Sequence, residues 1–247
     1  MVPKLSRRSL LVAGGGLLAA CAVPVREEEA REGLRLTARP DPSARARLRP
    51  GTSPIRLATG REGLLHVPRA EVRSVVVALH GAGGNARSGL RILRRQADRL
   101  GFALVVPASR GRTWDAVMGS EDRDTRALNQ ALAEVLRRLP VAPERVAVAG
   151  FSDGGTYALT LALANGDLFP RAVAFSPGFE NADRHRGRPE LFVTHGTRDT
   201  VLPIDRTSRP LVEELRGDGY AVTYREFDGG HTVPEQLADE AAQWLLR

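Results

Sequence analysis

The chain of 247 residues has very little of two residue types, and each shortage restricts its possible chemistry. It has one cysteine, Cys21, which excludes an intrachain disulfide framework and any zinc or iron–sulfur site built from several cysteines. It has one lysine, Lys4, against 35 arginines. Schiff-base chemistry, a phosphate-binding P-loop and a kinase-type ion pair all need a lysine, so the sequence beyond Lys4 excludes them.

Positive charge is in excess, but it is not concentrated in any one region. The formal net charge is +7, and removing residues 1–20, which carry three basic groups and no acid, leaves 33 basic against 29 acidic side chains. These basic residues are scattered from Arg26 to Arg247 without a polybasic run, and aromatic residues make up only 5% of the chain. Nucleic-acid-binding proteins cluster their basic residues on one face, so no nucleic-acid partner is expected.

The first 21 residues have the features of an export signal. Basic residues, including the pair Arg7 and Arg8, precede an apolar stretch over 10–20, which is shorter than the roughly 20 residues that span a bilayer. The arginine pair is similar to a twin-arginine signal. The segment LAAC resembles a bacterial lipobox, in which Cys21 would be lipid-modified; the alternative is an ordinary secretory signal. The interpretation is an exported protein held to the bacterial cell envelope by a lipid anchor on Cys21.

The remaining chain divides into a polar segment and one domain. Residues 22–53 are rich in Arg, Glu, Pro and Ala without an apolar period, which predicts a flexible, solvated tether. Residues 54–247 alternate short apolar runs with helical patterns, which predicts one α/β domain with a mostly parallel sheet covered by helices on both faces. The expected strands cover residues 55–58, 64–67, 74–79, 102–106, 145–149, 171–175, 191–194 and 222–227. The expected helices cover residues 87–100, 124–139, 154–165, 205–217 and 234–246.

Four polar, glycine-rich loops follow strands of this expected sheet. Their sequences are HGAGGN from residue 80, GFSDGG from 150, HGTRD from 195 and DGGH from 228. The segment GFSDGG fits a nucleophile elbow, a tight strand-to-helix turn that exposes Ser152. Because ligands of α/β sheets bind at the carboxyl ends of the strands, these loops are where we expect the active site.

A serine hydroxyl becomes an effective nucleophile when a base takes its proton and an acid orients that base. Ser152, Asp199 and His231 supply these groups in the chain order expected for this fold. Asp205 is the main rival to Asp199 as the acid, and Asp228 a lesser one. Asp199 is preferred because it follows a strand directly. His80 and His195 are interpreted as hydrogen-bonded loop anchors, and His66 and His185 are assigned no role.

Acyl transfer also needs two N–H donors for the negative charge that develops on the carbonyl oxygen. One is expected from the backbone of Asp153, the residue after the nucleophile, and the other from Ala82 in the loop after the first core strand. Trp114 is a candidate for lining the substrate pocket, with packing in the core as an equal alternative. The segment between 175 and 191 is too short for a helical lid, so an open site is expected.

Together, the segments LHGAGG, GFSDGG, HGTRD with TVLP, and GGHTVP resemble the α/β-hydrolase superfamily. They are most similar to its phospholipase/carboxylesterase group and to the esterases of the polyhydroxybutyrate-depolymerase and feruloyl-esterase type. The resemblance covers residues 72–247. It implies an α/β-hydrolase fold, a Ser152–His231–Asp199 triad, and an oxyanion hole from Ala82 and Asp153. The short segment between 175 and 191 predicts that this fold has no sizeable cap domain. Dienelactone hydrolases share the architecture but carry a cysteine where Ser152 stands, so this branch is disfavoured.

The predicted function is a serine carboxylesterase that cleaves a small-molecule ester through an acyl-enzyme. No cofactor or metal is expected, because a serine, a histidine, a carboxylate and two backbone amides suffice for this chemistry. The alternatives are an exported peptidase or thioesterase on the same fold, and an envelope lipoprotein that binds a ligand without turnover.

Overall fold

The computed structural model describes residues 33–44, 48–119 and 123–247. The expected export signal, with Cys21, lies outside these residues, so the signal and the lipid anchor stay predictions. Within the described ranges, no helix has both the length and the apolar character needed to cross a membrane.

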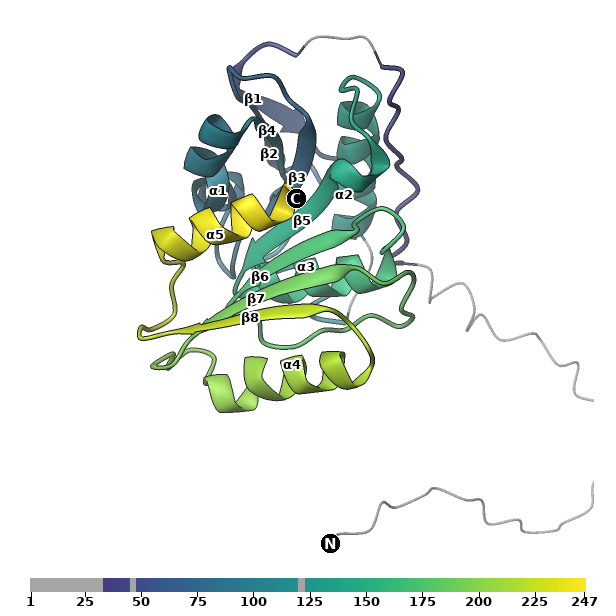
Figure 1. Ribbon diagram of the computed structural model, residues 1–247. Coiled ribbons are helices and arrows are strands. Elements are labelled where there is room, and N and C mark those ends of the chain that lie inside the picture. The colour runs from purple at the N-terminus through teal and green to yellow at the C-terminus, as the bar shows by residue number, and fades with distance from the viewer. Residues whose placement is uncertain (1–32, 45–47, 120–122) are drawn as a thin grey trace, which may run out of the picture.

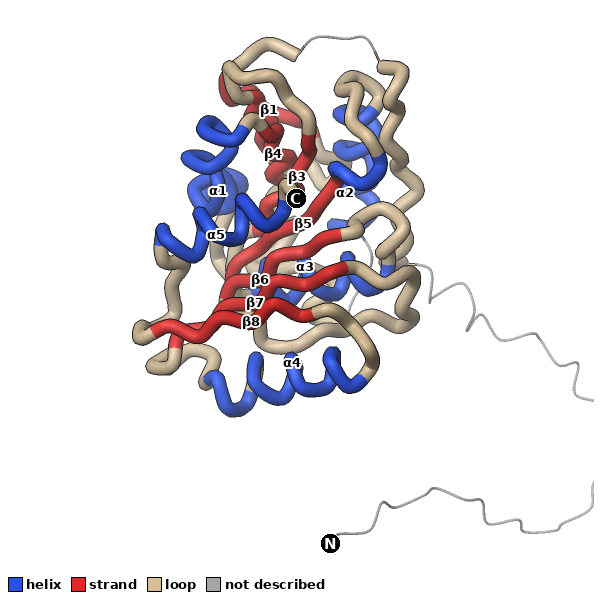
Figure 2. The backbone as a smooth tube through the Cα atoms, in the orientation of Figure 1, coloured by secondary structure: helices blue, strands red, loops and turns tan. Residues whose placement is uncertain are grey.

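One eight-stranded sheet runs through the molecule in the order β1-β2-β4-β3-β5-β6-β7-β8 (Figures 1 and 2). Its strands are β1 (Gly51–Arg56), β2 (Glu62–Val67), β3 (Ser74–Leu79), β4 (Phe102–Val106), β5 (Val146–Phe151), β6 (Arg171–Phe175), β7 (Glu190–Gly196) and β8 (Val222–Phe227). The pairs β1–β2 and β2–β4 are antiparallel, and every other neighbouring pair is parallel. The carboxyl ends of β3 to β8 therefore share one edge of the sheet.

The continuous apolar runs arise because the parallel strands are buried on both faces. In β3, Val75, Val77 and Leu79 join one hydrophobic cluster while Val76 and Ala78 join the other, as a period of two requires. Five helices cover these two faces: α1 (Ala86–Leu100), α2 (Arg123–Leu136), α3 (Asp153–Ala164), α4 (Ser208–Gly217) and α5 (Glu235–Leu245). Helices α1 and α5 cover one face and α2, α3 and α4 the other (Figure 1). The prediction of a mostly parallel sheet between two helical layers is confirmed.

The start of one helix differs from the prediction, and the segment between β6 and β7 is as short and irregular as expected. The helix expected over 205–217 is wrong at its start, because Ile204–Arg206 forms a 3-10 turn and Thr207 leaves helical geometry before α4 begins. Between β6 and β7, residues 176–189 form only loops and turns, with no helix. No cap domain therefore covers the carboxyl edge at that point.

The expected tether is wrong over its described part. Leu36 is fully buried, and its backbone N–H donates to Asn165 Oδ1 at 2.8 Å. Arg35 forms a two-pronged ion pair with Asp167, and the guanidinium hydrogen bond lowers the pKa of Asp167 to about 2. Leu34, Leu36 and Ala38 pack against the core. The prediction failed because these three apolar residues are too few to change the polar average composition of the segment. Strand β1 also begins at Gly51, inside the range assigned to the tether.

Candidate active site

Ser152 lies in the turn between β5 and α3, with backbone angles φ 56° and ψ −123°. A non-glycine residue at positive φ is strained by about 1–3 kcal/mol and persists only where its surroundings impose it. Here the Ser152 N–H donates to Phe175 O, and its carbonyl accepts from the Thr156 N–H, both at 2.9 Å. This turn projects the Ser152 side chain from the carboxyl edge of the sheet, as an elbow motif predicts.

Glycines allow the strand and the helix to approach each other at this turn. A Cβ atom on Gly154 would collide with the carbonyls of Leu79 and His80, and one on Gly150 would collide with the carbonyl of Gly154. A Cβ on Gly81 would sit 3.2 Å from that of Ser152, so the loop after β3 lies directly beside the serine. Close backbone packing therefore requires glycine at 150 and 154, whereas Gly83 has open space and is instead favoured by its positive φ of 69°.

The structure brings Ser152, His231 and Asp199 into one hydrogen-bonded chain. His231 Nε2 is 2.9 Å from Ser152 Oγ, and His231 Nδ1 is 2.6 Å from Asp199 Oδ2. The Phe151 ring packs against the His231 ring with centroids 4.7 Å apart. The rival acids lie elsewhere, since exposed Asp205 pairs with Arg209 and exposed Asp228 with Arg198.

Asp199 is buried but well supplied with donors. Burial alone would raise its pKa, but hydrogen bonds from the Leu202 N–H, from His231 and from the Val201 N–H outweigh it, and the net pKa is lowered. The amides of Val201 and Leu202 both bind Oδ1 at 2.9 Å, which leaves Oδ2 for His231. The carboxylate therefore stays charged and faces the imidazole with a fixed oxygen.

His195 supports this carboxylate from behind. Its Nε2 lies 2.8 Å from Leu202 O and 3.1 Å from Asp199 Oδ2, and its Nδ1 lies 2.6 Å from Ser208 Oγ. Two acceptors at Nε2 assign the proton to that nitrogen, and burial lowers the pKa of His195, which favours the neutral ring. His195 is thus a loop anchor that also contacts the candidate acid, a role that the sequence pattern did not reveal.

The backbone amides of Ala82 and Asp153 have no acceptor among the hydrogen bonds of the described residues. The loop that carries Ala82 is fixed by bonds from Gly83 N to Arg112 O at 2.6 Å and from Gly84 N to Gly81 O at 3.0 Å. Asp153 begins α3, where the helix dipole favours negative charge. The oxyanion role of these two amides stays a prediction.

Of the two alternatives for Trp114, the structure matches packing in the core, and it adds a contact of the Asp153 side chain for which no prediction was made. Trp114 does not line a pocket, because its indole is only 1% exposed, stacks on Tyr157 and donates from Nε1 to His80 O at 2.9 Å. The amphipathic indole packs in the core while its N–H finds a backbone acceptor. The carboxylate of Asp153 is held by the Thr113 hydroxyl, which ties the loop after β4 to the serine turn.

A second chain of hydroxyl, imidazole and carboxylate lies in the β1–β2 hairpin. Thr52 Oγ1 is 2.9 Å from His66 Nδ1, and His66 Nε2 is 2.8 Å from Asp98 Oδ1. Thr52 and His66 are direct cross-strand partners, and Asp98 reaches them from α1. We call these three residues the hairpin relay.

No group of three His, Cys, Asp or Glu side chains in the described ranges could hold a metal ion.

The known proteins to which the sequence is similar are described as esterases, thioesterases or hydrolases. A family model described as "Putative esterase" matches residues 119–211. An acyl-protein thioesterase 1 of Gibberella zeae is 29% identical over 151 residues, which are 54% of this chain and 62% of that protein. The putative hydrolase MhqD of Bacillus subtilis is 27% identical over 186 residues, 69% of this chain and 92% of that protein.

Among solved structures, a fluorophosphonate-binding serine hydrolase of Staphylococcus aureus superposes with a TM-score of 0.64 at 16% identity, over 80% of this chain and 98% of that one. At this identity the superposition establishes the fold alone, which is that of the α/β-hydrolases. The match to the esterase model over residues 119–211 is the finding that points to ester hydrolysis.

Proposed function

We propose that the chain is a serine carboxylesterase that hydrolyses small carboxylic esters through an acyl-enzyme on Ser152. The observation that carries the proposal is the hydrogen-bonded chain from Ser152 through His231 to Asp199 beside two unoccupied backbone amides. An activated hydroxyl and an oxyanion site on the same side of a strand end are what acyl transfer requires.

In the acylation step, His231 Nε2 takes the proton of Ser152 Oγ as the oxygen attacks the ester carbonyl carbon. Asp199 holds the imidazole so that Nε2 faces the serine, and its charge stabilises the imidazolium that forms. The amides of Ala82 and Asp153 stabilise the negative oxygen of the tetrahedral intermediate. His231 then returns the proton to the leaving alcohol as the C–O bond breaks.

Deacylation repeats these steps with water in place of the serine. His231 takes a proton from the water, the resulting oxygen attacks the acyl carbon, and the proton goes to Ser152 Oγ as the acid is released. Every step uses a group within the hydrogen-bonded chain or one of the two amides. The proposed reaction is therefore complete with groups that this chain supplies.

A thioesterase is the second candidate, and one observation favours it. The matched fungal protein carries the name acyl-protein thioesterase, so the same triad geometry would act on an acyl–sulfur bond. A thiolate is a better leaving group than an alkoxide, so this reaction depends less on protonation of the leaving group by His231.

The test is a substrate panel that pairs oxygen esters with thioesters of the same acyl chains. For a carboxylesterase we expect kcat/KM to be higher for short oxygen esters than for the matched thioesters, and Ser152→Ala to remove both activities. Consistently higher values for the thioesters would replace the proposal with its alternative. Absence of turnover on both series, with a folded protein that binds an ester, would indicate the non-catalytic alternative.

We further propose that the protein is exported and anchored to the bacterial cell envelope by a lipid on Cys21. Support comes from the sequence alone, in the basic start, the apolar stretch and the segment LAAC. In cells, the full-length protein should sediment with membranes and Cys21→Ser should release it or block its processing. Recovery of both forms in the cytoplasmic soluble fraction would contradict the proposal.

A further inference from the structure

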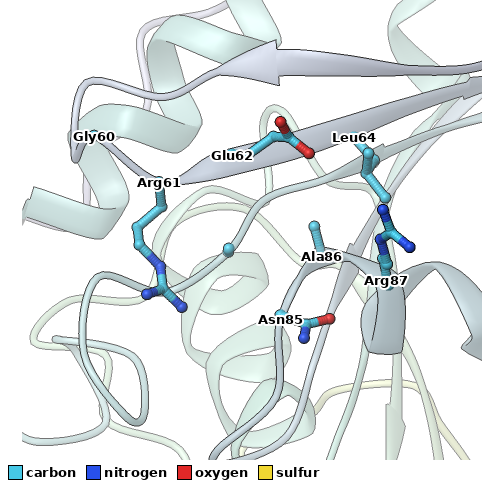
Figure 3. A pocket seen from close by; sticks show the side chains of 8 residues that line it. Gly60, Arg61, Glu62, Leu64, Asn85, Ala86 and Arg87 are labelled. Carbon is cyan, nitrogen blue, oxygen red and sulfur yellow. The ribbon is translucent and has the colours of Figure 1, made fainter.

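A cavity of about 330 Å³ lies beside the loop that carries Ala82, at the same edge of the sheet as Ser152. It is bounded by the turn before β2, the start of α1 and the end of β4 (Figure 3). The antiparallel pairing of Leu64 with Val106 brings the start of β2 to the carboxyl end of β4. The cavity is lined by Gly60, Arg61, Glu62, Leu64, Asn85, Ala86, Arg87 and Ala108.

Two arginines give this cavity a positive character. Within the described part of the chain, the guanidinium groups of Arg61 and Arg87 have no acidic partner, whereas Arg35, Arg99 and Arg209 form ion pairs. The cavity also borders the first turn of α1, which contains no acidic residue. The positive end of the helix dipole therefore adds to the charge of the two arginines.

Glu62 is the one acid in the lining. Figure 3 shows Arg61 extending from the hairpin toward the loop with Asn85, while Glu62 projects along its strand. Neither arginine forms an ion pair with Glu62. Two cations against one anion leave the cavity with a net positive charge.

The cavity is within reach of the reacting atoms. Asn85 directly follows the glycine loop, in which Gly81 packs beside Ser152. Strands β5 and β2 are three positions apart in the sheet, or about 14 Å at the usual interstrand spacing. The pKa of His80, which precedes this glycine loop, is lowered by burial, raised by the hydrogen bond to Gly81 O and lowered further by the charge of Arg61, so Arg61 acts on the start of that loop.

The triad geometry decides which part of an ester faces this cavity. His231 must protonate the leaving oxygen, so the alcohol group lies on the β7–β8 side of Ser152, where Asp199 and His231 are located. The carbonyl oxygen faces the amides of Ala82 and Asp153, and the acyl chain takes the third direction, away from His231. The sheet order puts β3, β4 and β2, and with them the cavity, on that side.

We propose that this cavity binds an anionic end of the acyl group, so that the preferred substrates are hemiesters of dicarboxylic acids or similarly charged acyl esters. Arg61 and Arg87 supply the charge, and the side-chain N–H groups of Asn85, whose Oδ1 caps α1, supply a further donor. The proposal rests on the esterase function proposed above and specifies the substrate class of that same site.

The experiment compares nitrophenyl hemiesters, from hemisuccinate to hemisuberate, with neutral nitrophenyl esters of the same chain length. The measured quantity is the ratio of kcat/KM for the charged ester to that for the neutral one. An exposed charge pair contributes up to about 1 kcal/mol, so Arg61→Gln and Arg87→Gln should each lower this ratio about three- to fivefold. The double variant should lower it by about tenfold, and added salt should lower the wild-type ratio.

Two further variants serve as controls. Arg91→Gln removes a charge from the same helix outside the cavity lining and should leave the ratio within about twofold of wild type. Glu62→Gln removes the opposing charge and should raise the ratio. Opposite signs for the glutamate and arginine variants cannot arise from a general loss of stability.

The measurements distinguish failure of the anionic subsite from failure of the esterase function. A wild-type ratio below one, or arginine variants that change charged and neutral turnover equally, would overturn the anionic subsite while leaving the esterase function intact. Absence of turnover with neutral and charged esters alike, in folded wild-type protein, would instead contradict the esterase function on which the subsite rests.

Discussion

The molecule contains two chains of hydroxyl, histidine and carboxylate with nearly equal distances. In the candidate triad, Ser152 Oγ is 2.9 Å from His231, which is 2.6 Å from Asp199. In the hairpin relay, Thr52 Oγ1 is 2.9 Å from His66, which is 2.8 Å from Asp98. Hydrogen-bond lengths alone therefore do not distinguish a catalytic site from a structural one.

The surroundings distinguish them. Ser152 is held at positive φ between a strand end and a helix start, beside two amides without acceptors, whereas Thr52 is an ordinary strand residue in a direct cross-strand pair. The Asp199 side chain is fully buried and receives two amide donors, whereas the Asp98 side chain is half exposed. We infer that the backbone around the serine, and not the relay itself, provides the catalytic capacity.

The largest expected effect separates the two hydroxyls. Ser152→Ala should reduce ester turnover by at least roughly 10⁴-fold, because the acyl-enzyme can no longer form. Thr52→Ala should leave turnover within about twofold of wild type, because Thr52 lies in β1, four positions from β5 in the sheet, and bonds to His66. Initial rates with a short nitrophenyl ester measure both effects, and circular dichroism verifies that each variant is folded. A large loss in Thr52→Ala would contradict the distinction.

The two carboxylates provide the next contrast. Asp199→Asn should lower kcat by roughly 10²–10⁴-fold, because the amide can no longer stabilise the imidazolium form of His231 or fix its tautomer. Asp98→Asn should leave kcat unchanged, since His66 lies outside the site. Steady-state kinetics on the paired variants give the comparison. Equal losses in the two variants would mean that the hairpin relay contributes to the reaction.

A smaller effect concerns stability at the hairpin relay. His66 is 3% exposed and joins β1 to α1 through its two hydrogen bonds. His66→Gln should lower the free energy of unfolding by about 1–2 kcal/mol and leave kcat unchanged. Urea denaturation gives the stability change, and the matched Thr52→Ala variant should lose less because it retains the bond to Asp98. No change in stability would show that the hairpin relay does not help to hold the fold together.

The smallest expected effect is a pH dependence. The folded-state pKa of Asp199 is lowered below its ordinary value of 3.8, so its charged form stabilises the fold above about pH 4 and this contribution is lost at lower pH. Wild type should exceed Asp199→Asn in stability at neutral pH, and the difference should narrow below pH 4. Denaturant titrations across the acid range measure it. Ser152→Ala keeps the Asp199 carboxylate, so its stability should follow the wild-type dependence on pH. If the stability difference between wild type and Asp199→Asn widened in acid, the predicted direction of the effect would be wrong.

The sequence predicted the architecture because the architecture depends on local patterns, and it named the candidate site residues from the loops that follow the strands. Parallel strands share a carboxyl edge, so the polar loops at Ser152, Asp199 and His231 had to converge once the strands were recognised. The choice of Asp199 over Asp205 followed from its position directly after a strand. In the structure, the Asp205 side chain is exposed and bound to Arg209, whereas Asp199 is bound to His231; the role of Asp199 as the acid stays a prediction.

Features that depend on long-range contacts were not predictable in this way. The hairpin relay requires the register that pairs Thr52 with His66, together with the distance to α1, and neither follows from local composition. Trp114 was a candidate pocket residue because loop position does not reveal burial. Leu36 was assigned to a tether because its partner, Asn165, lies at the far end of α3.

Covalent labelling with a fluorophosphonate, followed by peptide mass mapping, tests most directly whether activation resides at Ser152 alone. The account predicts one adduct, on Ser152, that is lost in Ser152→Ala and in the denatured protein and retained in Thr52→Ala. An adduct on Thr52, or undiminished labelling of Ser152→Ala, would contradict it.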